Sequence, residues 1–415
     1  MLERTRLAVR RLLTMANLFE NLHEAYGEGE ALAAREPLGY RLFPSATLTF
    51  ADCLRFSNLA AEAFIRELDL KKGERVLLMI PEPVELLLAS VSLMKAGGIA
   101  VPLPYGLSGE EASRRAAGCG ATLAVVDGRL LAERPGLSRC MPGVERVMAS
   151  GPRSRAPEGV PSLDAALDAS SGFFLPYTLK PGSVVGLFHT RMRDASLKAV
   201  MATNEMILGT RRLFAPWALC GPGRRFLSAL SPVGTGGFAT AVAALLAGIR
   251  VAFTAEGDTG PLAAALASER PHVFAASPEQ YSRLLQAGGV GAGARGVWLW
   301  LCWGYGLARE EVAELGTSGG GERPVPAPVV EIGDVDGNAA MLALKLSFRG
   351  WIWPREGRGM VIPPNRVRTG GGEGAGERQA RVLAARGPAV TPGYWNDLEG
   401  TLSAKRDGWL YLPTR

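Results

Sequence analysis

The 415-residue sequence has few of the residues that usually mark a disulfide framework or a metal site. Its five cysteines, at positions 53, 119, 140, 220 and 302, form no CxxC pair and no even-numbered set. This pattern favours a reduced, cytoplasmic protein over a secreted disulfide-rich one. The three histidines, His23, His189 and His272, are far apart in the sequence, so we expect no zinc site of the usual spacing and no resident metal.

Long apolar runs and long runs of one charge are also missing. No stretch reaches the roughly 18 apolar residues of a membrane-spanning helix, so no membrane partner is expected. The net charge is +6 and the pI is near 9.2, but the excess arginines are scattered along the chain. Scattered charge does not predict nucleic-acid binding, whereas a negatively charged ligand or an acidic protein fits it.

Apolar runs that alternate with amphipathic stretches predict an α/β fold. Residues 1–14 are basic and amphipathic, and we interpret them as an extension before a second possible start at Met15. Residues 15–181 and 182–345 each alternate strand-like and helix-like segments, which predicts two helix-covered, mainly parallel sheets. The Pro/Ser/Gly-rich residues 150–181 connect them. Residues 346–415 contain short strand-like runs and turns, which predict a small, β-barrel-like third subdomain.

The stretch GLFHTRMRDASLKAVMATNEMIL, from Gly186, has the outline of a phosphate-binding element. An apolar run is followed by a polar turn, one lysine and a segment that predicts a helix. Phosphate loops normally contain glycines, because these let backbone N–H groups approach the phosphates. The loop from His189 to Lys198 contains none, so its place suggests a nucleotide site but its composition does not.

Several motifs, in this order, resemble the large N-terminal domain of the adenylate-forming superfamily, which includes acyl- and aryl-CoA ligases. They are LKKGERVLLMIPEPVELLLASVSLMKAGGIAVPLP, LSALSPVGTGGFATAVAALLAGIRVAF, RPHVFAASPEQYSRLL and ARGPAVTPGYWND. The last is close to the family's V-R-G-P-x-V-x-x-G-Y-W-N. The run DVDGNAAML resembles the benzoate-type aryl-CoA ligases. The resemblance implies that fold for residue 15 onward and also implies that the sequence ends before the family's small C-terminal domain.

The phosphate loop departs from the family's Y-T-S-G-T-T-G-x-P-K-G. In the aligned HTRMRDASLKA, only Thr190 and Lys198 match, and these are the candidate cofactor-binding residues. Met192 and Ala195 replace glycines. Asp194 replaces a hydroxyl residue and would place a carboxylate near the phosphates.

Other positions implied by the resemblance are also altered. The family's Thr-Glu pair, which binds adenylate and magnesium, corresponds to Ala339 and Ala340, and the ribose-binding aspartate corresponds to Thr414. Each lost charge-stabilising group typically removes about 3–4 kcal/mol of transition-state stabilisation. We therefore expect ATP and Mg²⁺ binding, and with it adenylation, to be lost.

Three side chains near this region have a chemical and a structural interpretation. Lys198 could neutralise a phosphate or be a solvated lysine at a helix start. His189 could be a general base or a packed histidine. Cys302, in the apolar run WLWLCWGYG, could accept an acyl group or fill the core.

The resemblance implies an acyl or aryl pocket between two glycine-rich segments. Residues 233–237 would form one wall and residues 303–306 the other, and small glycines would leave room for a flat ring. The tryptophans here could instead fill the core. The candidate substrate-binding residues are Val233, Gly234, Thr235, Gly236, Trp303, Gly304, Tyr305, Gly306 and Gly337.

A retained acyl pocket beside a lost ATP site predicts ATP-independent transfer of an aryl or acyl group from CoA to an acidic acyl carrier protein. No cofactor beyond the CoA thioester is then required, and a separate CoA ligase would supply that thioester. This resembles the anthranilate-priming transferases of aurachin-type polyketide assembly. Two alternatives stay open: a non-catalytic acyl-binding or scaffold protein, and an active ligase whose C-terminal domain comes from another chain.

Overall fold

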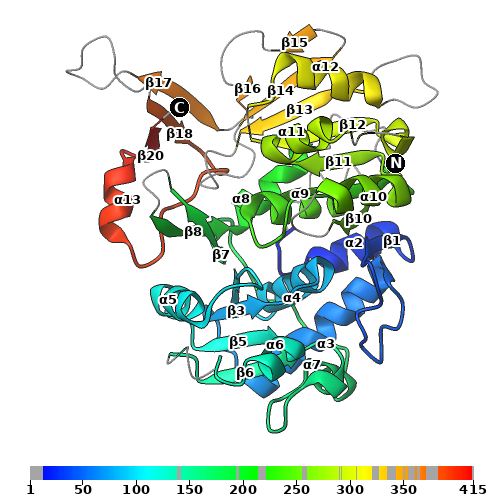
Figure 1. Cartoon of the computed structure of the whole chain (residues 1–415). Helices are drawn as coiled ribbons and strands as arrows, with labels where there is room; N and C mark the ends of the chain where they lie inside the picture. The colour runs from blue at the N-terminus through cyan, green and yellow to red at the C-terminus, as the bar shows by residue number, and fades with distance from the viewer. Residues whose placement is uncertain are drawn as a thin grey trace.

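The computed structural model arranges the chain around two large sheets, with helices between them and on both outer sides (Figure 1). A smaller sheet lies beside them at the C-terminal end of the chain (Figure 1). The structure describes residues 13–137, 141, 143–192, 196–213, 221–254, 259–288, 290, 292–304, 306–319, 327–333, 343–348, 351–353, 360–361, 365–370 and 382–413.

The first sheet has the strand order β6-β5-β3-β4-β7-β8. All neighbouring pairs are parallel except β7 and β8, which form an antiparallel pair at one edge. Its strands are β3 (Arg75–Met79), β4 (Ile99–Pro102), β5 (Leu123–Asp127), β6 (Arg146–Ser150), β7 (Val184–Arg191) and β8 (Leu197–Thr203).

The second sheet has the order β15-β14-β13-β12-β11-β9-β10-β1-β2, with β16 paired to β14. It is parallel from β13 to β1 and antiparallel at both ends. Its strands are β1 (Glu30–Ala33), β2 (Thr47–Thr49), β9 (Arg225–Ser228), β10 (Arg250–Phe253), β11 (Val273–Ala276), β12 (Leu299–Trp303), β13 (Val329–Gly333), β14 (Ala343–Phe348), β15 (Trp351–Trp353) and β16 (Met360–Val361).

The helices follow the expected sequence signals. In α3, Thr49 accepts a hydrogen bond from the Asp52 amide and Asp52 returns one to the Thr49 amide, which is a reciprocal cap. No helix in the described part of the chain is long and apolar enough to cross a membrane. The α-helices are α2 (Leu18–Tyr26), α3 (Phe50–Leu68), α4 (Pro83–Lys95), α5 (Gly109–Cys119), α6 (Gly128–Glu133), α7 (Leu163–Asp168), α8 (Asn204–Leu208), α9 (Thr235–Leu246), α10 (Thr259–Glu269), α11 (Pro278–Gln286), α12 (Arg309–Ser318) and α13 (Leu398–Ala404).

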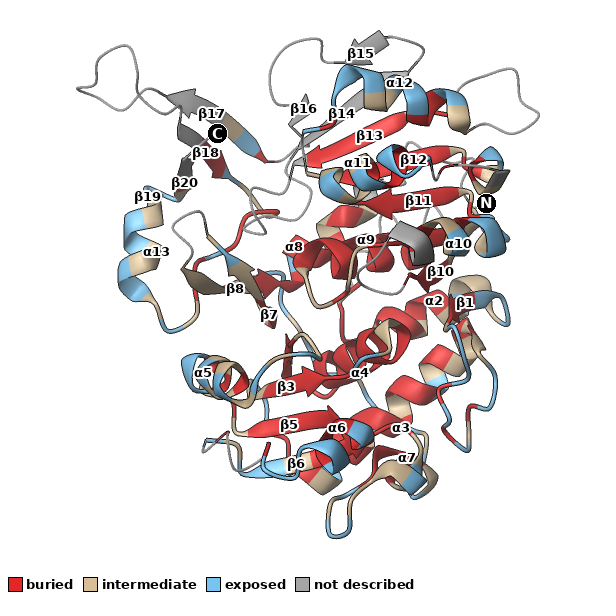
Figure 2. Ribbon diagram, viewed as in Figure 1, coloured by how far each residue is buried: buried red, intermediate tan, exposed pale blue. Residues whose placement is uncertain are grey.

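Strand alternation in the two large sheets gives three apolar cores among the described residues, and a fourth, small cluster of Ala385, Val390 and Leu410 lies at the C-terminal sheet. The central core joins the facing sides of the two sheets through α3, α4 and α9, which are buried along much of their length (Figure 2). The two outer cores pack the remaining sheet faces against α5 and α6 or against α10, α11 and α12. Successive residues of one strand therefore enter different cores: Leu301 faces the central core and Cys302 an outer one.

The predicted α/β class with two helix-covered, mainly parallel sheets is confirmed. The predicted barrel-like subdomain is not: from residue 366 on, its described strands form an open antiparallel sheet, in the order β17-β18-β20-β19, while β15 and β16 join the second large sheet. Closure would require the outer strands to pair with each other, and no such pairing occurs among the described residues. The strands are β17 (Arg366–Gly370), β18 (Val382–Arg386), β19 (Lys405–Arg406) and β20 (Trp409–Pro413).

The helix predicted directly after the loop at 189–198 is also wrong. Residues 197–203 form β8, and α8 begins only at Asn204. Register partners along β7, from Arg191 back to Val184, hold this segment extended, and tertiary pairing thus overrides the local helical pattern. The sheets also exchange strands between the predicted segments: β1 and β2 join the second sheet, while β7 and β8 join the first.

Candidate functional site

The two glycine-rich segments expected to form the acyl pocket meet at the carboxyl ends of the second sheet. Residues 233–237 lead into α9, and residues 303–306 follow β12. A Cβ atom added at Gly236 would lie 2.6 Å from Nε1 of Trp303, so the indole packs directly on the glycine backbone. Trp303 is buried and Val233 packs against the same central core. Only glycine at 236 permits this approach.

The turn after β12 depends on glycine conformation. Gly304 has φ +114° and Gly306 φ +141°, which side-chain-bearing residues rarely adopt. The Gly304 amide donates to the Ile332 carbonyl at 2.8 Å, and the Gly306 amide donates to Oε1 of the buried Glu331 at 3.3 Å. These bonds fix the turn against β13.

Two other predicted pocket residues lie beside the contact between Gly236 and Trp303. Gly234 is the residue before α9, and Thr235 is buried at its first turn. Tyr305 and Gly337 lie outside the described residues, as do the rest of DVDGNAAML, Ala339 and Ala340 included.

The phosphate side of the predicted site is the β7–β8 hairpin. Thr190 and Lys198 are register partners on the two strands, so the two residues that match the family's loop lie side by side on one face. Between them, residues 193–195, with Asp194 and Ala195, are outside the described part of the chain.

Lys198 is neither a solvated lysine at a helix start nor free to neutralise a phosphate alone. Its Nζ lies 2.5 Å from Oδ2 of Asp397 and 5.8 Å from the centre of the Tyr394 ring. The hydrogen bond from Lys198 holds the pKa of Asp397 below its usual range. A phosphate bound here would therefore meet a carboxylate that already occupies the lysine.

The GPAVTPGYWND motif brings Asp397 to the hairpin. The Met201 amide donates to the Gly393 carbonyl at 3.1 Å, and the Trp395 amide donates to the Ala199 carbonyl at 2.9 Å. On its other side, the Trp395 indole donates to the Cys119 carbonyl at 2.9 Å. The motif thus ties the hairpin to the end of α5, a structural role that the sequence analysis did not assign to it.

His189 faces away from the predicted acyl pocket. Phe188 enters the central core and Leu187 the outer core beside α5, so alternation places His189 on the α5 side. Its Nδ1 is buried and has no hydrogen-bond partner in the described structure. Burial, followed by the positive charge of Arg115, lowers the pKa of His189 to about 4. The side chain is neutral at pH 7 and would be a weak base toward a thiol.

Cys302 is fully buried on the opposite face of β12 from Trp303. It packs in the outer core near Tyr281, whose hydroxyl donates to the Leu301 carbonyl at 3.1 Å. An acyl thioester would have to open this core to reach the sulfur. The position therefore supports the core interpretation, and His189 and Cys302 lie on different sheets and face different outer cores.

For ATP with Mg²⁺, which the family resemblance implies, the described part of the hairpin offers a lysine that already has a carboxylate partner. The lysine is paired with Asp397, and Ala339 and Ala340, which correspond to the family's Thr-Glu pair, lie outside the described residues. Sequence reasoning missed Asp397, although it stands in the quoted motif. A carboxylate in a motif next to a phosphate loop was the available signal.

The fold has two sheets around a shared helical layer, and two glycine-rich segments meet at the carboxyl ends of the second sheet. The AMP-binding enzyme family model matches residues 23–395, and the chain belongs to that family. No curated protein matches the chain in sequence.

Solved structures of CoA ligases share the fold. ATP-bound MatB from Rhodopseudomonas palustris is 19% identical, with a TM-score of 0.75 over 97% of this chain and 76% of that one. A benzoate CoA ligase from Burkholderia xenovorans LB400 is 18% identical, with a TM-score of 0.78 over 96% and 76%. The N-terminal domain of FACL13 from Mycobacterium tuberculosis is 16% identical, with a TM-score of 0.74 over 96% and 95%. At these identities the likeness establishes the fold.

Proposed function

We propose that the protein transfers an aryl or acyl group from a CoA thioester to the thiol of an acidic acyl carrier protein, without ATP. The proposal is supported by two contacts, one on the expected acyl side of the site and one on the expected phosphate side. Gly236 and Trp303 build a wall that requires glycine, while Lys198 is paired with Asp397 instead of standing ready for phosphate.

The proposed chemistry needs little from the protein beyond positioning. The carrier thiol loses its proton to solvent, and its thiolate attacks the thioester carbonyl carbon. The new C–S bond forms, the bond to the CoA sulfur breaks, and CoA leaves as a thiolate that takes up a proton. One thioester replaces another, so the step requires no phosphate energy. Holding the carrier sulfur close to the carbonyl carbon, above the plane of the thioester, supplies most of the rate enhancement.

The structure changes the roles expected for two residues within this proposal. A base of pKa about 4 on the α5 side does little to activate a thiol, and a fully buried sulfur is not an accessible acyl acceptor. We therefore infer direct transfer, with neither His189 nor Cys302 in a covalent or proton-transfer step. The overall charge of +6 suits an acidic carrier protein.

The test uses purified protein, preformed benzoyl-CoA and acetyl-CoA, and the phosphopantetheinylated carrier encoded nearest to the gene. Intact-mass spectrometry should show acylated carrier above the uncatalysed rate, and Cys302→Ala should retain the activity to within about twofold. An inactive Cys302→Ala together with a mass adduct on Cys302 in the parent would replace direct transfer by a ping-pong route. No carrier acylation with any donor would leave the non-catalytic binding protein as the better account.

Family membership keeps one second candidate in view, an active acyl- or aryl-CoA ligase whose C-terminal domain is supplied in trans. Thr190 and Lys198 lie opposite each other on the two strands of the hairpin, which is what a residual nucleotide site would need. Pyrophosphate release from Mg²⁺-ATP and an aryl acid, measured with and without a separately produced family C-terminal domain, distinguishes the two. Release in either case favours the ligase.

A further inference from the structure

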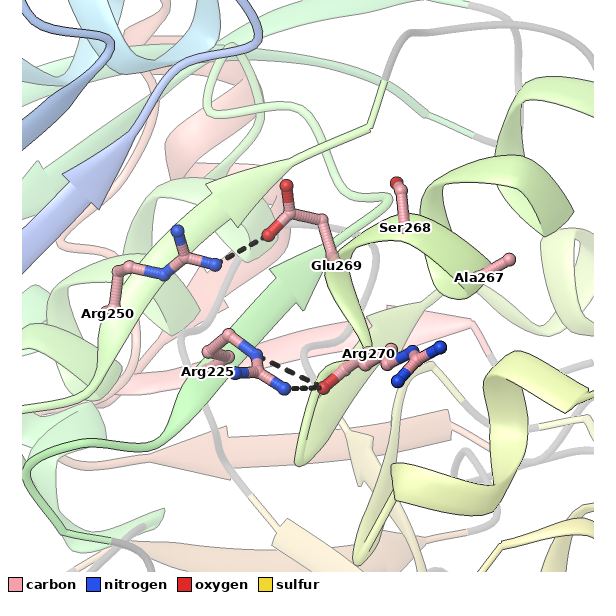
Figure 3. A pocket seen from close by; sticks show the side chains of 6 residues that line it. All are labelled: Arg225, Arg250, Ala267, Ser268, Glu269 and Arg270. Carbon is pink, nitrogen blue, oxygen red and sulfur yellow. Dashed lines mark hydrogen bonds and ion pairs between the residues drawn. The ribbon is translucent and has the colours of Figure 1, made fainter.

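A hollow of about 730 Å³ opens at the amino ends of the second sheet's strands, the edge opposite the glycine-rich turns (Figure 3). Strands β9 and β10 begin at Arg225 and Arg250, and β11 begins just after Arg270. The last turn of α10 closes one side. The lining residues are Arg225, Arg250, Ala267, Ser268, Glu269 and Arg270.

The charge of this hollow is unbalanced. It is lined by three arginines and one glutamate, a net of two positive charges, with no aromatic side chain and no large aliphatic one. Such a lining does not suit an acyl chain or a flat ring. The hollow is a broad depression open to solvent, wider than a single oxyanion needs.

Two of the arginines are held next to each other by the sheet. Arg225 and Arg250 are register partners on parallel neighbouring strands, so their side chains leave the sheet on the same face. Like charges directly opposite on a sheet repel, and Glu269 and Glu30, which both pair with Arg250, offset part of this repulsion. An anion bound between them would remove the repulsion.

Hydrogen bonds hold the guanidinium groups of Arg225 and Arg250 in place, but these bonds do not use all of their N–H donors. Arg225 donates through Nε and Nη2 to the Arg270 carbonyl at 3.2 and 2.8 Å, and Arg250 donates through Nη2 to Glu269 at 2.6 Å (Figure 3). The Nε of Arg250 makes no hydrogen bond within the described residues, but it lies 3.7 Å from Oε2 of Glu30 in an ion pair. Each arginine has five N–H donors, so preorganised donors remain for a ligand.

Arg270 itself adopts a backbone conformation that its side chain does not favour. Its φ is +44°, the left-handed region where glycine or asparagine is preferred. The Arg225 guanidinium grips its carbonyl, and the side chain is exposed at the rim. The conformation is that of a helix C-terminal cap, in which the Arg270 amide donates to the Leu266 carbonyl at 3.1 Å, and it leaves the side chain at the rim of the hollow, where an anion can reach it.

We propose that this hollow binds a small molecule with two or more linked phosphates. Arg225 and Arg250 hold the phosphates from the sheet side and Arg270 closes over them from the rim. The site lies at the far ends of the strands that carry the acyl pocket, so it is separate from the nucleotide position of the family. The shared chemistry is that of a polyphosphate chain, whether free or as part of a nucleotide or coenzyme.

The experiment titrates the full chain with Mg²⁺-free inorganic pyrophosphate and tripolyphosphate, using isothermal calorimetry in low-salt buffer. Both should bind, tripolyphosphate more tightly, and monophosphate about tenfold more weakly or not at all. Binding should weaken as salt is raised, because the interaction is electrostatic. ADP and CoA are titrated in the same way, which distinguishes a site for free polyphosphate from a site for the phosphates of a coenzyme.

Three variants locate the site. Arg270→Gly removes the rim guanidinium and suits the left-handed backbone, so the fold is retained and affinity should fall about tenfold or more, the range for a lost charge-assisted bond. Arg283→Ala removes an equal charge from the exposed face of α11, outside the hollow, and should bind like the parent. Glu269→Gln removes the only carboxylate in the lining and should tighten binding.

Lys198→Ala separates this site from the family's phosphate loop. It should leave pyrophosphate affinity unchanged if binding occurs at the arginine hollow. A loss of binding in Lys198→Ala with none in Arg270→Gly would place the anion at the hairpin and overturn the proposal. Equal affinity in the parent, Arg270→Gly and Arg283→Ala, or no pyrophosphate binding by the parent at millimolar concentration, would overturn it as well.

Discussion

The acyl side and the phosphate side of this domain are built on the same scaffold but have diverged differently. On the acyl side, Gly236 and Trp303 form a contact that only glycine allows, and this contact lies on rigid elements. On the phosphate side, the hairpin keeps its place, but Lys198 has taken Asp397 as its partner. The difference teaches that on one scaffold a packing contact can hold one side of a site while an ion pair occupies the lysine on the other side.

The largest expected effect is on the pH dependence of the free energy of unfolding, and it comes from His189 in the hairpin on the phosphate side. The folded pKa of His189 is about 4, below the ordinary value of 6.5, so the unfolded chain takes up the proton first. The contribution of neutral His189 to the free energy of unfolding is fully present above pH 6.5 and is lost as the pH falls toward 4. We expect a loss of up to about 3 kcal/mol in unfolding free energy that His189→Gln does not show.

Chemical denaturation at several pH values measures this effect. Arg115→Gln should shrink it, because Arg115 contributes to lowering the His189 pKa. Parallel stability curves for the parent and His189→Gln between pH 6.5 and 4 would show that the hairpin histidine is not held neutral. The pH profile of transfer should likewise contain no titration near 6.5 that His189→Gln abolishes.

A substitution on the acyl side should have the next largest effect. Gly236→Ala places a Cβ against the buried indole of Trp303, and we expect a loss of about 2 kcal/mol of stability, typical of overpacking, with weaker acyl-CoA binding. Gly234→Ala is the matched control, since its Cβ would have only an ordinary contact at 3.8 Å.

A double-mutant cycle sharpens this prediction. Trp303→Leu removes the atoms nearest to the new Cβ, so Gly236→Ala should cost much less in that background, and the helix propensity of alanine can then favour it. Thermal unfolding of the four proteins decides the point. Equal costs of Gly236→Ala in both backgrounds would mean that the indole does not press on this glycine.

The smallest expected effect concerns the ion pair that occupies the lysine. Lys198→Met and Asp397→Asn, combined in a cycle, should give a coupling of about 1 kcal/mol, because the pair is partly exposed. Asparagine can still accept the cap hydrogen bond from the Gly400 amide, so α13 is preserved. The folded pKa of Asp397 is lowered, so the coupling should persist at neutral pH and disappear in acid. A coupling of zero would mean that Asp397 does not hold Lys198, which would then be available to a phosphate.

Local patterns predicted the two sheets because buried strands such as Arg75–Met79 and capped helices such as Phe50–Leu68 have strong signals. They failed for residues 197–203, where pairing with β7 decides the conformation. The contact of Gly236 with Trp303 was foreseen only as two facing walls. The partnership of Lys198 with Asp397 was not foreseen, because 199 residues separate the two in sequence.

An experiment that changes the acyl donor tests the central claim most directly. Purified protein and carrier are given either preformed aryl-CoA, or the free aryl acid with CoA and Mg²⁺-ATP, and the carrier mass and pyrophosphate are followed in both mixtures. The asymmetry between the two sides of the site predicts acylated carrier only from aryl-CoA, and no pyrophosphate in either mixture. Pyrophosphate and acyl transfer from the free acid, by this protein alone, would contradict the account.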